Sequence, residues 1–99
     1  MNGSADYSVY LVQCGDGSLY TGITTDVERR IAEHEDSSKG AKYLRGRGPL
    51  KLVFQKPIGS RSLATRVEHR IKRMPKQQKQ DLKRLPAAID QLLQELADQ

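Results

Sequence analysis

The amino-acid sequence predicts an α+β fold, a three-stranded antiparallel sheet flanked by helices in the order β-β-α-β-α-α with an added C-terminal helix. Two stretches rich in β-branched and aromatic residues lie on either side of Gly15-Asp16-Gly17, which predicts a β-hairpin. A third stretch, residues 50–55, alternates apolar and polar side chains. The other segments place apolar residues three and four positions apart, the spacing of an amphipathic helix.

The hairpin strands are expected at residues 7–14 and 18–24, and the third strand at 50–55, where Pro57 and Gly59 end it. A helix follows the hairpin. Either Thr25 or Asp26 caps this helix, Val27 and Ile31 form its inward stripe, and residues 36–38 end it.

Three further helices are expected after the third strand. The first is capped by Ser60 or Ser62 and runs to about Arg73, a short one covers residues 76–85, and the last begins at Pro86. The apolar stripe of the first consists of Leu63, Ala64, Val67 and Ile71, and the apolar face of the last consists of Ile89, Leu92, Leu93 and Leu96. We expect the last face to pack on its own domain, although a second subunit is the alternative, so the chain is expected to be a monomer or a weak homodimer.

One domain is expected at residues 7–84, preceded by a flexible N-terminus (1–6) and followed by an amphipathic helix (85–99) packed on it. The single cysteine, Cys14, excludes an intrachain disulfide and fits a small core residue. Residues 1–6 have no basic or apolar signal segment, and no apolar run is long enough to span a bilayer. These features predict a cytoplasmic protein with no membrane partner.

Positive charge is concentrated in one part of the sequence. Residues 39–84 hold fifteen of the 17 Lys and Arg residues but only two of the 12 acids, within a net charge of +5. A segment this basic favours a polyanionic partner, and nucleic acid is the leading class. The alternative is a solvated, lysine-rich surface.

The tripeptides Ser8-Val9-Tyr10 and Tyr20-Thr21-Gly22, with Arg30 ten residues after Tyr20 and Glu68 in a later helix, resemble the signature of the GIY-YIG nucleases. Residues 22–30 resemble the run that follows the second tripeptide in that family. The segments 39–42 and 45–49 resemble the short stand-alone bacterial branch, the YhbQ-like group. The resemblance covers about residues 7–84. Ser8, Val9 and Thr21 depart from the family's tripeptides, whereas both tyrosines and Gly22 are kept.

The resemblance implies an endonuclease that hydrolyses phosphodiester bonds in DNA with one divalent metal, Mg²⁺ or Mn²⁺, in repair or recombination; RNA is a second substrate class. Two alternatives stay open. One is a nucleic-acid-binding module of the same fold with little or no activity, and the other is a subunit whose last helix docks on a partner nuclease. The joint presence of Tyr10, Tyr20, Arg30 and Glu68 favours the enzyme.

Glu68 is the candidate metal ligand. It is the only acid among five nearby cations, namely Arg61, Arg66, Arg70, Lys72 and Arg73. Mg²⁺ is typically held by one or two carboxylates together with waters and phosphate oxygens. The alternative role is an ordinary surface ion pair.

Arg30 is the candidate phosphate clamp, because a guanidinium stays charged and grips two oxygens. It lies three residues after Val27 and four before His34, so it borders the buried stripe, whereas Arg29 points elsewhere and is expected to contact nucleic acid. His34 shares the Arg30 face and is a candidate proton relay or phosphate ligand; a structural histidine is the alternative.

Tyr10 and Tyr20 are the candidates for positioning and for the general base. A phenol is a poor base at neutral pH unless cations such as Arg30 and the metal lower its pKa. By the resemblance Tyr20 is favoured as the base, with Tyr10 orienting water or phosphate. The alternative is that both are half-buried strand tyrosines.

The two tyrosines share a face only if the hairpin loop has an odd length. A two-residue loop pairs residues whose numbers sum to 33 and puts Tyr10 and Tyr20 on opposite faces. A three-residue loop pairs Tyr10 with Gly22 and Tyr20 with Val12, on one face, and suits Gly17 in the left-handed conformation. We therefore predict the three-residue loop, with Gly22 leaving space beside Tyr10.

The glycine-rich segment between the first helix and the third strand is the expected nucleic-acid contact. Its cations suit a phosphate backbone and its tyrosine can stack on a base. The residues are Lys39, Lys42, Tyr43, Arg45 and Arg47.

Overall fold

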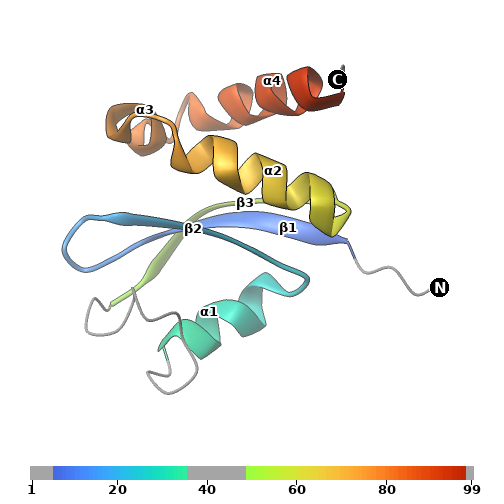
Figure 1. Cartoon of the computed structure of the whole chain (residues 1–99). Helices are drawn as coiled ribbons and strands as arrows, with labels where there is room; N and C mark the ends of the chain where they lie inside the picture. Colours follow the sequence, from blue (N-terminus) through green and yellow to red (C-terminus); the bar gives the residue numbers. More distant parts are fainter. Residues whose placement is uncertain (1–5, 36–48, 98–99) are drawn as a thin grey trace.

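A computed structural model describes residues 6–35 and 49–97 of the chain. The elements in chain order are β1 (Tyr7–Gln13), β2 (Leu19–Thr24), α1 (Val27–Glu35), β3 (Lys51–Gly59), α2 (Arg61–Lys72), α3 (Lys76–Gln80) and α4 (Leu85–Ala97). They form an antiparallel sheet with strand order β2-β1-β3 and helices on both faces, which confirms the predicted α+β fold. Figure 1 shows α1 on one side of the sheet and α2 on the other, with α4 beyond α2.

The central strand β1 is buried on both faces, since successive side chains of a strand point in opposite directions. Val9 and Leu11 belong to the larger core, which they share with α2 and α4. Tyr10 and Val12 belong to a second, smaller core on the α1 side. Cys14, 4% exposed, also packs in the smaller core, as predicted.

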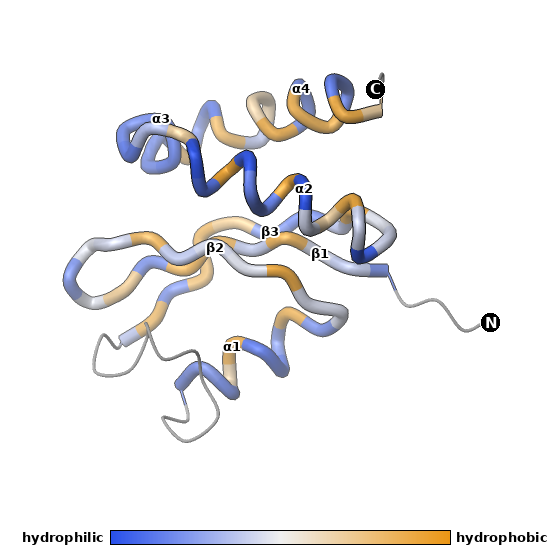
Figure 2. The backbone as a smooth tube through the Cα atoms, in the orientation of Figure 1, coloured by the Kyte–Doolittle hydropathy of each residue, from blue (hydrophilic) through white to orange (hydrophobic). Residues whose placement is uncertain are grey.

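Helix α4 completes the larger core. Leu85 and Ile89 are fully buried, Leu92 and Leu96 are 6% exposed, and Leu93 packs against the same cluster. Figure 2 shows hydrophobic residues of α4 on the side that faces α2. Two ion pairs also join α4 to the rest of the domain. Lys56 Nζ of β3 lies 3.1 Å from Asp90, and an Arg70 nitrogen of α2 lies 2.9 Å from Glu95.

Capping side chains define where two helices begin. The Asp26 carboxylate accepts from the Arg29 backbone N–H at 3.1 Å, and the Ser60 hydroxyl accepts from that of Leu63 at 3.1 Å. Of the alternatives predicted, Asp26 and Ser60 are therefore the caps. Among the described residues, no helix is long and apolar enough to cross a membrane.

Two predicted boundaries were wrong. β3 continues through Pro57 to Gly59, because β3 is an edge strand, where a residue without a backbone N–H is tolerated. The strand adapts through a shift in its register with β1 beside this proline. The third helix ends at Gln80 rather than at residue 85, since Asp81 has ψ +81° and cannot continue a helix.

Candidate active site

The hairpin places Tyr10 and Tyr20 on the same face of the sheet. Tyr10 pairs with Gly22 and Val12 pairs with Tyr20, the register predicted for a three-residue loop. The Gly17 N–H donates to the Cys14 carbonyl at 2.9 Å, and the Cys14 N–H donates to the Ser18 carbonyl at 2.8 Å. Gly17 has φ +87°, the left-handed conformation that this loop requires.

Gly22 makes room for the ring of Tyr10. A Cβ atom at position 22 would lie 2.5 Å from the Tyr10 hydroxyl oxygen and 2.6 Å from Cζ. The ring therefore lies over the backbone of its cross-strand partner, and Tyr10 is only 1% exposed. The predicted space beside Tyr10 is present, and the ring fills it.

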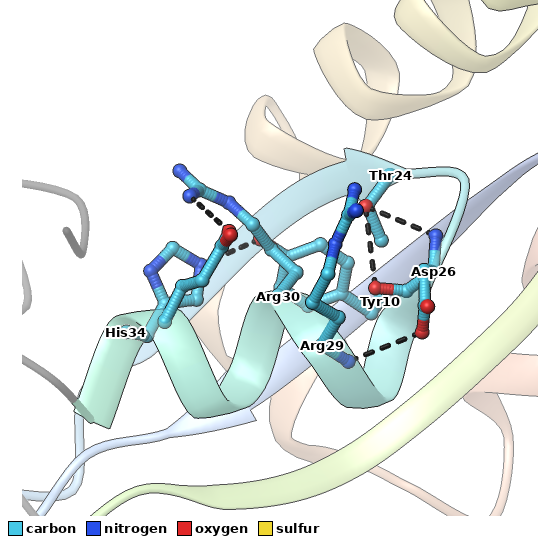
Figure 3. Close-up of polar contacts among 7 residues, drawn as sticks. Tyr10, Thr24, Asp26, Arg29, Arg30 and His34 are labelled. Atoms are coloured by element: carbon cyan, nitrogen blue, oxygen red, sulfur yellow. Dashed lines mark hydrogen bonds and ion pairs between the residues drawn. The ribbon is translucent and has the colours of Figure 1, made fainter.

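Helix α1 brings Arg30 and His34 to the tyrosines. The Tyr10 hydroxyl lies 2.7 Å from His34 Nε2 (Figure 3), and the positive charge of Arg30 acts on the same hydroxyl. His34 is 4% exposed. The T-shaped contact of Tyr20 with His34, at 5.5 Å between ring centroids, completes a three-ring cluster on this face.

Arg30 is held at the rim of this cluster. Its side chain is 32% exposed, and Nη1 donates to Glu33 Oε1 at 3.1 Å. Glu33 was not among the predicted site residues. Its position three residues after Arg30 on a helix could have predicted this ion pair. The contact restrains the guanidinium while leaving part of it open to solvent.

Glu68 lies on α2, on the other side of the sheet from α1, and acts on the tyrosines through its charge. Its side chain is 17% exposed, and Lys72 Nζ approaches its carboxylate at 3.7 Å. Its negative charge raises the pKa of both Tyr10 and Tyr20. Four elements, β1, β2, α1 and α2, therefore contribute charged or phenolic groups that interact electrostatically.

Burial dominates the protonation of both tyrosines. It is the main cause that raises the pKa of Tyr10 to about 12; Tyr20 and Glu68 add to this, and Arg30 opposes it. Burial also raises the pKa of Tyr20, again against the lowering effect of Arg30. The predicted lowering of both pKa values by Arg30 is thus present, but burial outweighs it, so the pKa of each phenol is raised.

Burial and the positive charge of Arg30 lower the pKa of His34, and Glu33 offsets part of this effect. Neutral imidazole is therefore the prevailing form at neutral pH, and its Nε2 is hydrogen-bonded to the Tyr10 hydroxyl. Arg30 stays charged: partial burial lowers its pKa, but Glu33 and Tyr10 raise it by more.

The donor set suits a hard cation held by few protein ligands. Within the described ranges there is no group of three or more His, Cys, Asp and Glu side chains that could enclose a metal. A single, mostly shielded carboxylate such as Glu68 fits Mg²⁺ or Mn²⁺, which take most of their ligands from water and phosphate oxygens. Glu68 therefore fits an open metal site, in which water and phosphate oxygens supply most of the ligands.

The predicted nucleic-acid contacts divide into two groups. Arg29 is exposed on α1, and the one contact drawn for it joins its backbone nitrogen to Asp26 (Figure 3). Lys39, Lys42, Tyr43, Arg45 and Arg47 lie outside the described residues.

Comparison with known proteins agrees with this architecture. Residues 6–81 match the family described as the GIY-YIG catalytic domain. The chain is 53% identical over 88 residues to the UPF0213 protein YhbQ of Escherichia coli K12, covering 89% of this chain and 87% of that protein. It is 57% identical over 77 residues to a UPF0213 protein of Cronobacter sakazakii, covering 78% and 80%.

Two solution NMR structures share the fold. A UPF0213 protein from Bacillus halodurans aligns with a TM-score of 0.51 and 46% identity over 81% of this chain and 84% of that one. A protein from E. faecalis aligns with a TM-score of 0.58 and 34% identity over 88% and 93%. The chain therefore belongs to the GIY-YIG catalytic-domain family, a family of nucleases, within the short bacterial group that includes YhbQ.

Proposed function

We propose that the protein is a metal-dependent endonuclease that hydrolyses phosphodiester bonds in DNA. The observation that carries the proposal is the interaction of Tyr10, Tyr20, Arg30 and Glu68, since the charges of Arg30 and Glu68 act on both phenols. Membership of a nuclease family supports the reaction class. RNA contains the same phosphodiester linkage, so RNA belongs among the substrates tested.

Arg30 is the proposed phosphate clamp. Hydrolysis builds negative charge on the non-bridging oxygens of the phosphate, and a fixed guanidinium stabilises that charge more than it stabilises the substrate. Arg30 suits this role because it stays charged and is partly solvent-exposed, and because Glu33 restrains it from one side. Its remaining N–H groups are oriented by the same contact.

Glu68 is the proposed ligand of one Mg²⁺ or Mn²⁺ ion. When bound, such an ion supplies Lewis acidity to phosphate oxygens and lowers the pKa of coordinated water. The loose contact with Lys72, at 3.7 Å, leaves carboxylate lone pairs for other ligands. Cation binding at Glu68 would also offset the negative charge that raises the pKa of Tyr20.

Tyr20 is the proposed proton acceptor for the attacking water, and Tyr10 is a positioning residue. Tyr20 is half-buried and lines an open hollow, whereas Tyr10 is 1% exposed and bonded to His34. The Tyr20 ring packs against the rings of Tyr10 and His34, which the hydrogen bond between those two residues holds in place. His34 thus acts through Tyr10 and Tyr20 in this proposal.

A cleavage assay tests the proposal. The purified full chain is incubated with single-stranded, nicked, duplex and branched DNA and with RNA, in Mg²⁺, Mn²⁺ or EDTA. We expect cutting that requires the metal, and a loss of at least about 100-fold in Glu68→Ala with binding retained. Tyr20→Phe is expected to lose cutting as well, and Glu95→Gln, which changes an acid on α4, is the matched control.

Two outcomes contradict the proposal. Binding without metal-dependent cutting by the wild-type chain would support a nucleic-acid-binding module instead. Cutting that survives both Glu68→Ala and Tyr20→Phe would show that another site, or another protein in the preparation, is responsible.

A further inference from the structure

A hollow of about 290 Å³ lies at the exposed edge of β2, beside the candidate active site. It is lined by Leu19, Tyr20, Thr21, Lys72 and Lys79. Tyr20 is thus shared between the hollow and the three-ring cluster that contains Tyr10 and His34. A ligand in the hollow would lie next to the proposed reaction centre.

Two lysines from different helices, Lys72 of α2 and Lys79 of α3, line the hollow. Lys72 is the last residue of α2, and Lys79 lies on α3, which folds back after the turn at residues 73–75. The Lys72 side chain is 50% exposed, and Lys79 is half-buried. Among the described residues no ion pair of Lys79 is found, so its charge is available to a ligand.

Two other hollows of the described structure lack this concentration of charge. One, lined by Gln13, Leu19, Val53, Gln80 and Leu82, contains no cation. In the other, next to α4, Arg84 is already paired with Asp81 at 3.7 Å. Only the β2 hollow, of these three, combines two lysines with no acid in its lining.

We propose that Lys72 and Lys79 form a subsite for a backbone phosphate that flanks the phosphate being cleaved. The ligand is a nucleic-acid strand that crosses the edge of β2, so the inference rests on the proposed nuclease function. Ammonium groups bind phosphates as point charges, and Lys72 and Lys79 both line the hollow at this edge. This subsite fixes the register of the strand relative to Arg30 and Glu68.

Lys79 is the better residue for a test, because Lys72 also contacts Glu68. Lys79→Ala removes one cation from the hollow, and Lys83→Ala removes an exposed lysine from the turn before α4, outside the hollow. Both are surface changes that leave the cores intact. Melting temperatures of the two variants equal to wild type would verify this.

The measurement is the binding of a fluorescein-labelled oligonucleotide in EDTA, by anisotropy, between 50 and 200 mM salt. We expect Lys79→Ala to weaken binding several-fold and to reduce the slope of log K against log salt by about 0.7–0.9, the value for one phosphate contact. Lys83→Ala is expected to match wild type. In single-turnover cleavage, Lys79→Ala is expected to raise the enzyme concentration needed for half-maximal rate, while the saturating rate changes little.

The outcomes separate the two proposals. If wild type cuts DNA but Lys79→Ala binds with the affinity and salt slope of Lys83→Ala, the subsite is wrong and the nuclease stands. If wild type binds no nucleic acid at any salt concentration, both are wrong. If Lys79→Ala abolishes the saturating rate with unchanged binding, Lys79 acts in the chemistry and the flanking subsite is again wrong.

Discussion

The Tyr10 ring occupies the place that a side chain at position 22 would take. These two residues are cross-strand partners, and a Cβ atom on residue 22 would come within 2.5 Å of the Tyr10 hydroxyl oxygen. The same hydroxyl lies 2.7 Å from His34 Nε2. A glycine on β2 therefore sets the position of a buried phenol on β1 and, through it, of a histidine on α1.

Gly22→Ala is expected to destabilise the protein by about 1–3 kcal/mol, because overpacking forces Tyr10 to move in a closely packed core. Urea unfolding gives the stability, and the NMR resonances of the His34 ring report the Tyr10 contact. Gly17→Ala is the control: it meets no atom within 4 Å but must adopt φ +87°, at a cost of about 1–2 kcal/mol. Its His34 resonances should stay in place; unchanged stability of Gly22→Ala would contradict the packing described.

The lowered pKa of His34 predicts that the folded protein loses stability in mild acid. The His34 pKa is lowered in the folded state, so the unfolded state binds more protons, and stability is lost as pH falls from about 6.5 through the folded pKa. The measurement is the unfolding free energy of wild type minus that of His34→Gln between pH 7.5 and 5. This difference should shrink with falling pH; a difference that grows would reverse the sign of the shift.

Tyr10 is expected to ionise with a pKa of about 12, because burial opposes the phenolate. Arg30→Gln should raise this pKa further, since Arg30 lowers it, and Glu68→Gln should lower it. The tyrosine ¹³Cζ resonances followed against pH give the values, with Tyr10→Phe used for assignment. The associated stability is present below pH 10 and lost as pH rises toward 12. A Tyr10 pKa near 10 would contradict the burial of this hydroxyl.

Helix α4 is expected to be required for stability, although the family match ends at residue 81. Ile89 is fully buried in the larger core, so Ile89→Ala should cost about 2–5 kcal/mol by urea unfolding. Leu82 is 44% exposed, and Leu82→Ala should change stability by less than about 0.5 kcal/mol. Equal effects of the two substitutions would mean that α4 is not part of the core.

The hairpin and the helix stripes were predictable from sequence because they depend on local chemistry. The glycine spacing around Asp16 selects a three-residue loop, and this loop fixes the register that puts Tyr10 opposite Gly22. Capping works in the same way: Asp26 and Ser60 each accept from a backbone N–H three residues later. Such contacts form within a few residues of the chain.

Features that depend on tertiary neighbours were not predictable in the same way. From the sequence alone, Pro57 is expected to end the strand. The strand continues because β3 lies at the edge of the sheet, which only the strand order reveals. The net pKa shifts of Tyr10 and Tyr20 depend on burial, which outweighs the Arg30 charge visible in the sequence. The place of Lys79 beside Tyr20 depends on the turn between α2 and α3.

The neighbouring arginines of α1 give the most direct test of the proposed active site. Arg30 is hydrogen-bonded to Glu33 and its charge acts on Tyr10 and Tyr20, whereas Arg29 is exposed on α1. The measurement is the single-turnover rate of metal-dependent DNA cleavage at saturating enzyme for Arg30→Ala and Arg29→Ala. We expect Arg30→Ala to lower this rate by about 100-fold or more, and Arg29→Ala to change only the concentration needed for saturation. Equal rates for the two variants would contradict a phosphate clamp at Arg30.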